Sequence, residues 1–457
     1  MKTICNAAGT GRMLALLMLA LAWAPVAQAK ERPNFLVLLS DDHNYRTLGA
    51  AGNAVLRTPH LDRLAKEGVY FNRCFTPNPI CQPSRASFHT GQSSWANGVT
   101  FNGKPMKKGS PLLARTLAEA GYETYFTGKW HGAGKPWTMG FTTGGRCWAG
   151  GKFDHFELAL TPFGGGPESR KTAQDYSSTV FTDDALAYLE GKRDKPFCAV
   201  VAYTVGHDVF KAPPGYEGKY APAEIPLPPN FMAQPPFKQF NPAIRDETVL
   251  PFPRDEQSVR VALAEYYAMF EHLDAQIGRL LGALERTGLA ENTVVIFASV
   301  KGMSMGSHGI IGKQTLYEEG IRSSLIVRHP GLRRAAGVSS ELVSTMDILP
   351  TVCTAAGVEL PAGVEGVSFL PFYEGRGEGR KRLFFMYDDP RRFTVTRAVR
   401  TRRYKFVQHL VTHESQLFDL VKDPNEMVNL AGAPEMKDVK TKLRASLMEW
   451  RKRGEEK

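Results

Sequence analysis

Cysteine is scarce in this chain, with six residues among 457, and the first of them, Cys5, lies in a separate N-terminal segment. The remaining five are odd in number and have no framework spacing; they are Cys74, Cys81, Cys147, Cys198 and Cys353. The pattern therefore does not predict a fold held together by disulfide bonds. At least one thiol is left without a partner, and in an exported chain such a thiol needs a chemical explanation.

Long apolar runs are also missing, except near the N-terminus. Lys2 and Arg12 precede the apolar run Met13–Trp23, and small residues ending at Ala29 follow it. A membrane anchor needs roughly 20 apolar residues, and this run is shorter. The order of positive, apolar and small residues predicts an export signal over residues 1–29, cleaved near Ala29. We expect a mature protein without a stable membrane span, located in the periplasm or secreted.

Internal repeats and nucleic-acid-binding motifs are absent from the sequence, so no nucleic-acid partner is expected. The net charge is +11, and loss of Lys2 and Arg12 with the export signal leaves +9, because residues 1–29 contain no acidic side chain. A basic surface is consistent with anionic substrates. The mature length of 428 residues permits one large domain with an appendage, or two domains.

Four segments have the apolar pattern of buried strands. They are Asn34–Leu39, Glu123–Thr127, Phe197–Tyr203 and Thr293–Ala298. The first is a continuous apolar run, which is typical of a strand buried on both faces. Helical patterns lie between the strands, including Ser110–Gly121, with Ser110 as N-cap, and a long amphipathic stretch from Asp255 to Arg286. The sequence is therefore predicted to be α/β, with a mostly parallel sheet covered by helices on both faces.

Polar residues follow these strands directly. Asp41 and Asp42 follow the first strand, Lys129 and His131 the second, and His207 the third. Ligands of such sheets bind outside the carboxyl ends of the strands. We therefore expect these side chains to line one pocket, with the proline-rich loop over residues 213–253 near its mouth.

The composition changes from about Pro361 onward, where glycine and arginine become frequent. Short strand patterns then occur at Leu383–Tyr387, Thr394–Val399 and Tyr404–Gln408, and a final amphipathic helix runs from about Met436 to Trp450. We expect residues 30–360 to form the main domain. Residues 361–457 are expected to form a smaller antiparallel sheet with a covering helix, packed on the main domain.

The segment Cys81-Gln82-Pro83-Ser84-Arg85, followed by Thr90-Gly91, resembles the signature of the sulfatase family. Six further segments resemble motifs of that family, and together they cover most of the mature chain. They are Ser40–Asp42, Thr58–Gly68, Gly128–His131, Gly206–Asp208, Gly306–Lys313 and Ser415–Pro424. The resemblance implies an alkaline-phosphatase-like α/β/α sandwich, with residues 30–360 as the catalytic domain.

The resemblance also implies the nucleophile. In the sulfatase family the signature cysteine, here Cys81, is oxidised to formylglycine by a maturation enzyme, which would act before export. The hydrated aldehyde attacks sulfur with one hydroxyl and expels sulfate by collapsing back to the aldehyde through the other. A helix expected from Ser84 to Thr90 would bring backbone N–H groups and Arg85 close to an anion, and Arg85 would hold the hydroxyls of the nucleophile.

Other roles are implied residue by residue. Lys129 and Lys313 match the lysines that bind sulfate oxygens. His207 matches the acid that protonates the leaving alcohol, and His131 matches the base that deprotonates the second hydroxyl in the release step. Asp41, Asp42 and residue 81 match ligands of a calcium ion.

The family pattern breaks at the metal site. Where members have Ser-Asp-Asn-Gly or Ser-Asp-His-Gly, this chain has Ser299-Val300-Lys301-Gly302, and matches on both sides exclude a register shift. A calcium ion needs six to eight oxygen ligands. Asp41 and Asp42 leave a charge of −2 where the family has −3, and Lys301 adds +1, so weak calcium binding or none is predicted.

Two arrangements of Lys301 are compatible with the sequence. The side chain could point away while another ligand fills the gap, or its ammonium could occupy the metal position, paired with Asp41 and Asp42. The leading function is a sulfuric ester hydrolase with reduced activity, acting on a sulfated glycan or on a small aryl or alkyl sulfate. The alternatives are an inactive relative that binds sulfated glycans, and a phosphonate or phosphate monoester hydrolase, which shares the fold and the cysteine motif.

Overall fold

The computed structural model describes residues 32–132, 134–151, 154–236, 245–335, 337–392 and 394–456. The expected export signal over residues 1–29 lies outside these ranges. Pro33–Lys457 form a compact unit. Among the described residues, no helix combines the length and the apolar character that a membrane crossing requires.

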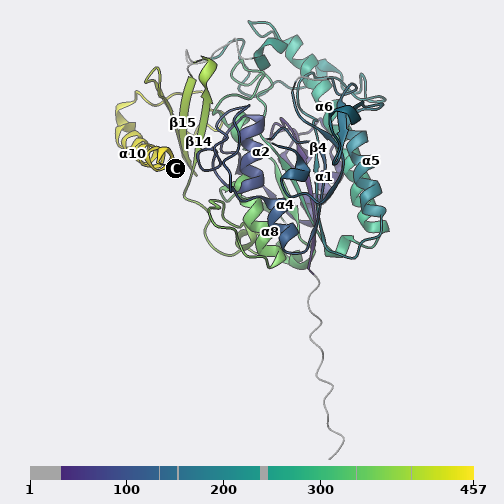
Figure 1. Ribbon diagram of the computed structural model, residues 1–457. Helices are drawn as coiled ribbons and strands as arrows, with labels where there is room; N and C mark the ends of the chain where they lie inside the picture. Colours follow the sequence, from purple (N-terminus) through teal and green to yellow (C-terminus); the bar gives the residue numbers. More distant parts are fainter. Residues whose placement is uncertain are drawn as a thin grey trace, which may run out of the picture. The chain divides into compact units, whose positions relative to one another are not determined.

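A ten-stranded sheet forms the centre of the molecule (Figure 1). Strand β1 (Asn34–Ser40) lies between β9 (Thr293–Ser299) and β8 (Phe197–Ala202), and β8 pairs with β4 (Glu123–Lys129). These four strands are parallel, so their carboxyl ends meet at one edge. Some of the outer strands pair in antiparallel fashion. The outer strands are β2 (Val69–Phe71), β5 (Thr143–Trp148), β6 (Ala159–Pro162), β7 (Lys171–Thr172), β11 (Leu325–Arg328) and β12 (Gly337–Ser339). The predicted mostly parallel sheet is confirmed.

Helices cover both faces of the sheet (Figure 1). One face packs against α1 (Pro59–Glu67), α5 (Ser177–Glu190) and α6 (Glu256–Arg286), and the other against α2 (Cys81–Thr90), α4 (Leu113–Glu119) and α8 (Ile348–Ala356). Strand β1 serves both layers, because Leu36 and Leu38 point to the first face while Phe35 and Val37 point to the second. This alternation explains why the strand is a continuous apolar run.

Helix boundaries agree with the sequence at α6 and differ at two other helices. Helix α6 covers the predicted amphipathic stretch, and Asp255 is its N-cap, since the Asp255 carboxylate accepts a hydrogen bond from Ser258 N at 2.8 Å. The predicted N-cap at Ser110 is wrong: α4 begins at Leu113, because Leu112 is still extended, with φ −140°. Helix α2 begins at Cys81 rather than Ser84, and its proline falls in the first turn, where no N–H is needed.

The C-terminal elements form a four-stranded antiparallel sheet covered by α10 (Lys437–Glu455). Its strands are β14 (Arg382–Asp389), β15 (Thr394–Thr401), β16 (Tyr404–His409) and β17 (Ser415–Asp419). The first three match predicted strands, whereas β17 was not predicted as a strand. One face packs on the main body, with Phe385 5.8 Å from Phe75 between ring centroids, and Leu443 and Leu447 of α10 cover the other face.

Shorter elements complete the described chain. They are α3 (Ser94–Asn97), α7 (Glu318–Ile321), α9 (Leu370–Tyr373), and a small sheet of β3 (Cys74–Phe75), β10 (Arg322–Ser323) and β13 (Val343–Ser344). The proline-rich loop over residues 213–253 is irregular where it is described, apart from 3-10 turns at Pro222–Glu224 and Arg245–Val249. Residues 237–244 of this loop lie outside the described ranges.

Candidate active site

The two aspartates that follow β1 lie at the carboxyl edge of the sheet, and both are fully buried. The backbone N–H of Asp41 donates to Val205 O at 3.1 Å, which ties the end of β1 to the segment after β8. Asp42 has a φ of 45°, a left-handed conformation that is uncommon outside glycine and concentrates at functional sites. The backbone thus turns sharply and presents two carboxylates to the same region.

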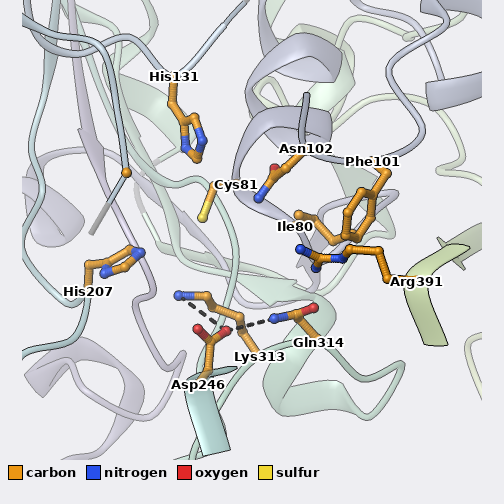
Figure 2. A pocket seen from close by; sticks show the side chains of 11 residues that line it. Ile80, Cys81, Phe101, Asn102, His131, His207, Asp246, Lys313, Gln314 and Arg391 are labelled. Atoms are coloured by element: carbon orange, nitrogen blue, oxygen red, sulfur yellow. Dashed lines mark hydrogen bonds and ion pairs between the residues drawn. The ribbon is translucent and has the colours of Figure 1, made fainter. Parts of the chain in front are cut away.

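Cys81 is the first residue of α2, and it lines a cavity of about 230 Å³. Figure 2 shows its sulfur between the imidazoles of His131 and His207, with the Lys313 side chain below. Burial opposes ionisation of the thiol, but the ammonium groups of Lys301 and Lys129 outweigh it and hold the pKa of Cys81 well below its usual range. The site therefore favours negative charge at residue 81.

The pKa values of the two histidines of the cavity are shifted in opposite directions. Burial lowers the pKa of His131, which keeps this imidazole neutral near pH 7. Burial, Lys313 and Lys129 also act against protonation of His207, yet hydrogen bonds to Asp208 and Cys81 leave its pKa raised. A neutral imidazole can accept a proton and a protonated one can donate it, so the pair is suited to base and acid roles.

Local contacts hold both rings in position. His207 Nδ1 lies 2.8 Å from Asp208 Oδ1, which directs the opposite ring edge toward the cavity, with Nε2 4.0 Å from Asp42 Oδ2. His131 has a φ of 46° and packs against Gly150. A Cβ at Gly150 would lie 2.6 Å from the His131 ring, so this close approach requires glycine.

Of the two lysines predicted to bind sulfate, Lys313 lines the cavity, whereas Lys129 lies deeper, as does Arg85, which was predicted to hold the hydroxyls of the nucleophile. Lys313 lines the cavity, pairs with Asp42 and lies 3.6 Å from Asp246 Oδ2. Lys129 pairs with Asp41, and Arg85 donates to Lys129 O at 2.7 Å. In the described part of the chain, the cavity wall includes neither Lys129 nor Arg85. These two act on the cavity as buried charge rather than as wall groups.

Lys301 points at the two aspartates. Its ammonium lies 2.8 Å from Asp41 Oδ1 and also bonds Asp42 Oδ1, and its side chain is fully buried. Burial opposes the charge, but both carboxylates raise the pKa of Lys301. Val300 instead joins the apolar core on the α2 side of the sheet. Of the two arrangements open from the sequence, the structure has the one in which the lysine pairs with the carboxylates.

This donor set does not fit calcium. All four oxygens of Asp41 and Asp42 accept from ammonium groups: Lys129 and Lys301 share the first carboxylate, and Lys301 and Lys313 share the second. Calcium needs six to eight oxygens, and four cationic side chains surround these two carboxylates.

Two other groupings have metal-ligand spacing. They are Asp41 with Cys81 and His207, and Asp42 with His207 and Asp208. The first mixes oxygen, sulfur and nitrogen, a set typical of zinc rather than calcium. Both groupings depend on an aspartate whose oxygens are already bonded to lysine.

Several cavity residues were not predicted from the sequence. They are Ile80, Phe101, Asn102, Gly151, Asp246, Gln314 and Arg391. Asp246 belongs to the loop that was expected near the pocket mouth, so its region, but not its contact with Lys313, could be anticipated. Arg391 comes from the C-terminal sheet, where no sequence pattern indicates a place at this cavity (Figure 2).

Comparison with known proteins decides the family. The model of the sulfatase family matches residues 33–358, and a second model, described as N-sulphoglucosamine sulphohydrolase, C-terminal, matches residues 306–453. The chain belongs to the sulfatase family. It is therefore a sulfuric ester hydrolase by family, and its α/β/α architecture is the one expected.

Two relatives of this sulfatase are named for sulfated sugars or glycans. An N-acetylglucosamine-6-O-sulfatase of Bacteroides thetaiotaomicron is 26% identical over 514 residues, covering 96% of this chain and 90% of that protein. An ulvan-active sulfatase of Formosa agariphila is 30% identical over 435 residues, covering 91% and 80%. The solved structure of BT4656 in complex with its substrate D-glucosamine-2-N,6-O-disulfate has a TM-score of 0.80 and 26% identity, covering 93% and 99%.

A likeness to another enzyme class shows the fold alone. The phosphonate monoester hydrolase of Agrobacterium radiobacter has a TM-score of 0.78 to this chain, with 23% identity and coverage of 93% and 96%. At this level of identity its reaction is not carried over.

Proposed function

We propose that this sulfatase hydrolyses sulfate esters of a sulfated glycan through a formylglycine made from Cys81 before export. The observation that carries the proposal is the position of Cys81, at the start of α2 and between a histidine with a lowered pKa and one with a raised pKa, in a cavity that favours negative charge. The glycan class rests on the names of two relatives, an N-acetylglucosamine-6-O-sulfatase and an ulvan-active sulfatase.

Three residues of the cavity wall carry out the reaction steps in this scheme: residue 81, His207 and His131. The Cys81 sulfur stands where the diol oxygens of hydrated formylglycine would lie. One hydroxyl gives its proton to solvent and attacks sulfur as an alkoxide, the bond to the sugar oxygen breaks, and His207, which later regains a proton from solvent, gives that oxygen its proton. His131 then removes the proton of the second hydroxyl, the aldehyde re-forms as sulfate leaves, and water hydrates it again. The balance is one ester and one water to one alcohol and one hydrogen sulfate.

The cations have a separate part in this scheme. Lys313 faces the cavity and is placed to contact sulfate oxygens, while Lys129 and Arg85 add positive charge behind residue 81. Backbone N–H groups in the first turn of α2 add to the attraction for an anion. The sulfate ester is anionic, so these positive charges favour its binding in the cavity.

Mass analysis of one tryptic peptide tests the nucleophile. The peptide Cys74–Arg85 contains two cysteines, and Cys74 is a buried residue whose pKa is raised by burial, so it serves as an internal control. We expect residue 81 to be about 18 Da lighter than cysteine. After unfolding and alkylation, a single alkyl group should then be present, on Cys74. Two alkyl groups in every preparation would contradict the proposal.

Turnover on matched esters tests the reaction class. A sulfated monosaccharide should be hydrolysed faster than the corresponding phosphate ester or a phosphonate monoester. Preference for the phosphonate would assign the chain to the activity of its phosphonate hydrolase neighbours. Binding of the sulfated sugar without turnover, despite a converted residue 81, would instead identify an inactive relative that binds sulfated glycans.

A further inference from the structure

The Lys301 ammonium lies in a position that is unusual for a lysine. It is fully buried, it bridges Asp41 and Asp42, and it does not line the described cavity wall. The Asp41 carboxylate that it bonds also lies within 4.8 Å of the Cys81 sulfur and a His207 ring nitrogen. The positive charge of Lys301 is therefore separated from residue 81 only by the Asp41 carboxylate.

The charge of this group equals that of a metal-bound group. Asp41, Asp42 and Lys301 together carry −1. Three carboxylates with one divalent cation also carry −1, so loss of a carboxylate at Val300, gain of an ammonium at Lys301 and loss of the dication together keep the net charge constant. Either change alone would shift the charge by one unit in a region where buried charge is costly.

The oxygen ligands show the same substitution. A metal ion would have to displace Lys301 from Asp41 Oδ1 and Asp42 Oδ1, and the ammonium would then stay buried beside a dication. Repulsion between two buried cations outweighs the gain from two carboxylate oxygens. Lysine and metal are therefore mutually exclusive occupants.

We propose that the Lys301 ammonium is the resident cation of this site, and that the protein binds no divalent metal and needs none for turnover. Its turnover part rests on the proposed function, whereas the binding part does not. Lys301 acts as a positioning residue: it holds the two carboxylates in place and supplies positive charge behind residue 81. The paired lysines Lys129 and Lys313 then remain on the outer oxygens of the same carboxylates.

Metal analysis of the mature wild-type chain is the first test. The protein is stripped with EDTA, dialysed against calcium, magnesium, manganese or zinc, and measured for bound metal and for thermal unfolding. We expect well below one equivalent of each metal and an unchanged Tm. One equivalent of any metal in the active site, or a Tm that rises by several degrees with the metal, would overturn the proposal, since a ligand of the native state stabilises it.

The second test converts the site. The double variant Val300→Asp, Lys301→Asn adds a carboxylate and a neutral oxygen ligand and removes the cation. Its calcium affinity, measured by calorimetry, should exceed that of wild type by at least about 100-fold. Lys301→Asn alone should gain less, because Val300 still leaves a carboxylate missing. A folded double variant that gains no calcium would show that Lys301 is not what excludes the metal.

Turnover separates this inference from the proposed function. EDTA should leave the wild-type rate unchanged and should lower the rate of the double variant at least about tenfold. Wild type that is free of metal but turns over no ester would contradict the proposed function and leave the binding part standing. Wild type with one bound metal and full turnover would contradict the binding part and leave the proposed function standing.

Discussion

Two groups in this sulfatase share one arrangement, a fully buried lysine between two buried carboxylates. In the catalytic group, Lys301 bridges Asp41 and Asp42. In the docking group, Lys405 of β16 bridges Glu318 of α7 and Glu426, which joins the C-terminal sheet to the main body. The bridge itself is therefore no sign of function.

The surroundings distinguish the two groups. Lys129, Lys313 and Arg85 also contact the carboxylates of the catalytic group, which borders a cavity and Cys81. The docking group has one further cation in contact with Glu318, Arg400 at 3.2 Å, and lines none of the described cavities. Cations in excess of the carboxylates beside a cavity indicate a place for an anion, whereas a buried group that borders no cavity indicates a structural contact.

The largest effect on turnover is expected from loss of the nucleophile, Cys81, which lies beside the catalytic group. Cys81→Ser should lower turnover at least about a thousandfold while the fold is kept, because one small polar residue replaces another. The control is Cys74→Ser, a buried cysteine seven positions earlier that lies outside the cavity. Equal losses in the two variants would contradict the assignment of residue 81.

A matched pair of lysine variants addresses the comparison directly. Lys301→Met and Lys405→Met each leave two buried carboxylates without their bridge, and each should destabilise the fold by about 3–5 kcal/mol. Only Lys301→Met should also lower kcat of the folded fraction, by about 100-fold, because its charge lies behind residue 81. Urea unfolding and rates per folded enzyme separate the two effects. Similar kcat values for both variants would remove the functional distinction between the groups.

Substitution of His131 and of His207, the two histidines beside the catalytic group, should impair different steps of the reaction. His131→Ala should complete one attack and then stall with residue 81 about 80 Da heavier, because release requires a base. His207→Ala should slow esters of poor leaving groups more than those of good ones. Mass spectrometry and a leaving-group series check these outcomes, and equal losses across the series would exclude His207 as the acid.

The pH profile of wild-type turnover should be bell-shaped. Activity should fall at low pH as His131, whose pKa is lowered by burial, becomes protonated. It should fall again at higher pH as His207, whose pKa is raised by its hydrogen bond to Asp208 against the effect of burial, loses its proton. A rate that does not change across this range would contradict both assignments.

The docking group predicts a pH effect on stability alone. Burial raises the pKa of Glu426 to about 8 despite the nearby Lys405 ammonium. A raised pKa stabilises the fold at pH values below the unfolded pKa, near 4.5, and this contribution is lost as pH rises toward 8. Glu426→Gln should flatten that decline in unfolding free energy without changing kcat. An identical decline in the variant would assign it elsewhere.

The smallest effect is expected at the cavity mouth. Arg391 is exposed, with its guanidinium 4.7 Å from the Phe101 ring centroid, and can contact a second anionic group of a glycan. Arg391→Ala should raise KM about threefold and leave kcat unchanged. Arg376→Ala, an exposed arginine that lines a different cavity, is the control. No change in KM would place the Arg391 side chain outside the substrate contact.

Much of the fold followed from the sequence because local patterns determine it. Continuous apolar runs marked the central strands, and polar residues after them marked the carboxyl edge. The domain boundary near residue 360 and the assigned catalytic roles stay predictions. Strand β17 was missed because its residues had been assigned only to a family motif.

Contacts between distant segments could not be predicted in the same way. The contact between Lys313 and Asp246 depends on the path of a long loop. Arg391 reaches the cavity only because the C-terminal sheet packs on the main body. The start of α4 depends on the extended backbone at Leu112, which the residues Ser110 and Pro111 do not reveal. Such features are fixed by tertiary packing, and no local pattern encodes them.

The strand ends that carry Lys301 and the aspartates are joined by their backbones. Val300 N donates to Ser40 O at 2.9 Å and His43 N to Lys301 O at 3.0 Å, independently of either side chain. Side chains at 300 and 301 can therefore be exchanged on an unchanged scaffold. Without metal, each single-exchange intermediate carries −2, one unit more negative than the −1 of either end, so both intermediates on a mutational path should be worse than its ends. A sulfatase that depends on the lysine and one that depends on a metal are thus separated by intermediates of lower activity. In the cycle of wild type, the two single variants and the double variant, the effects of the two substitutions on turnover should be strongly non-additive.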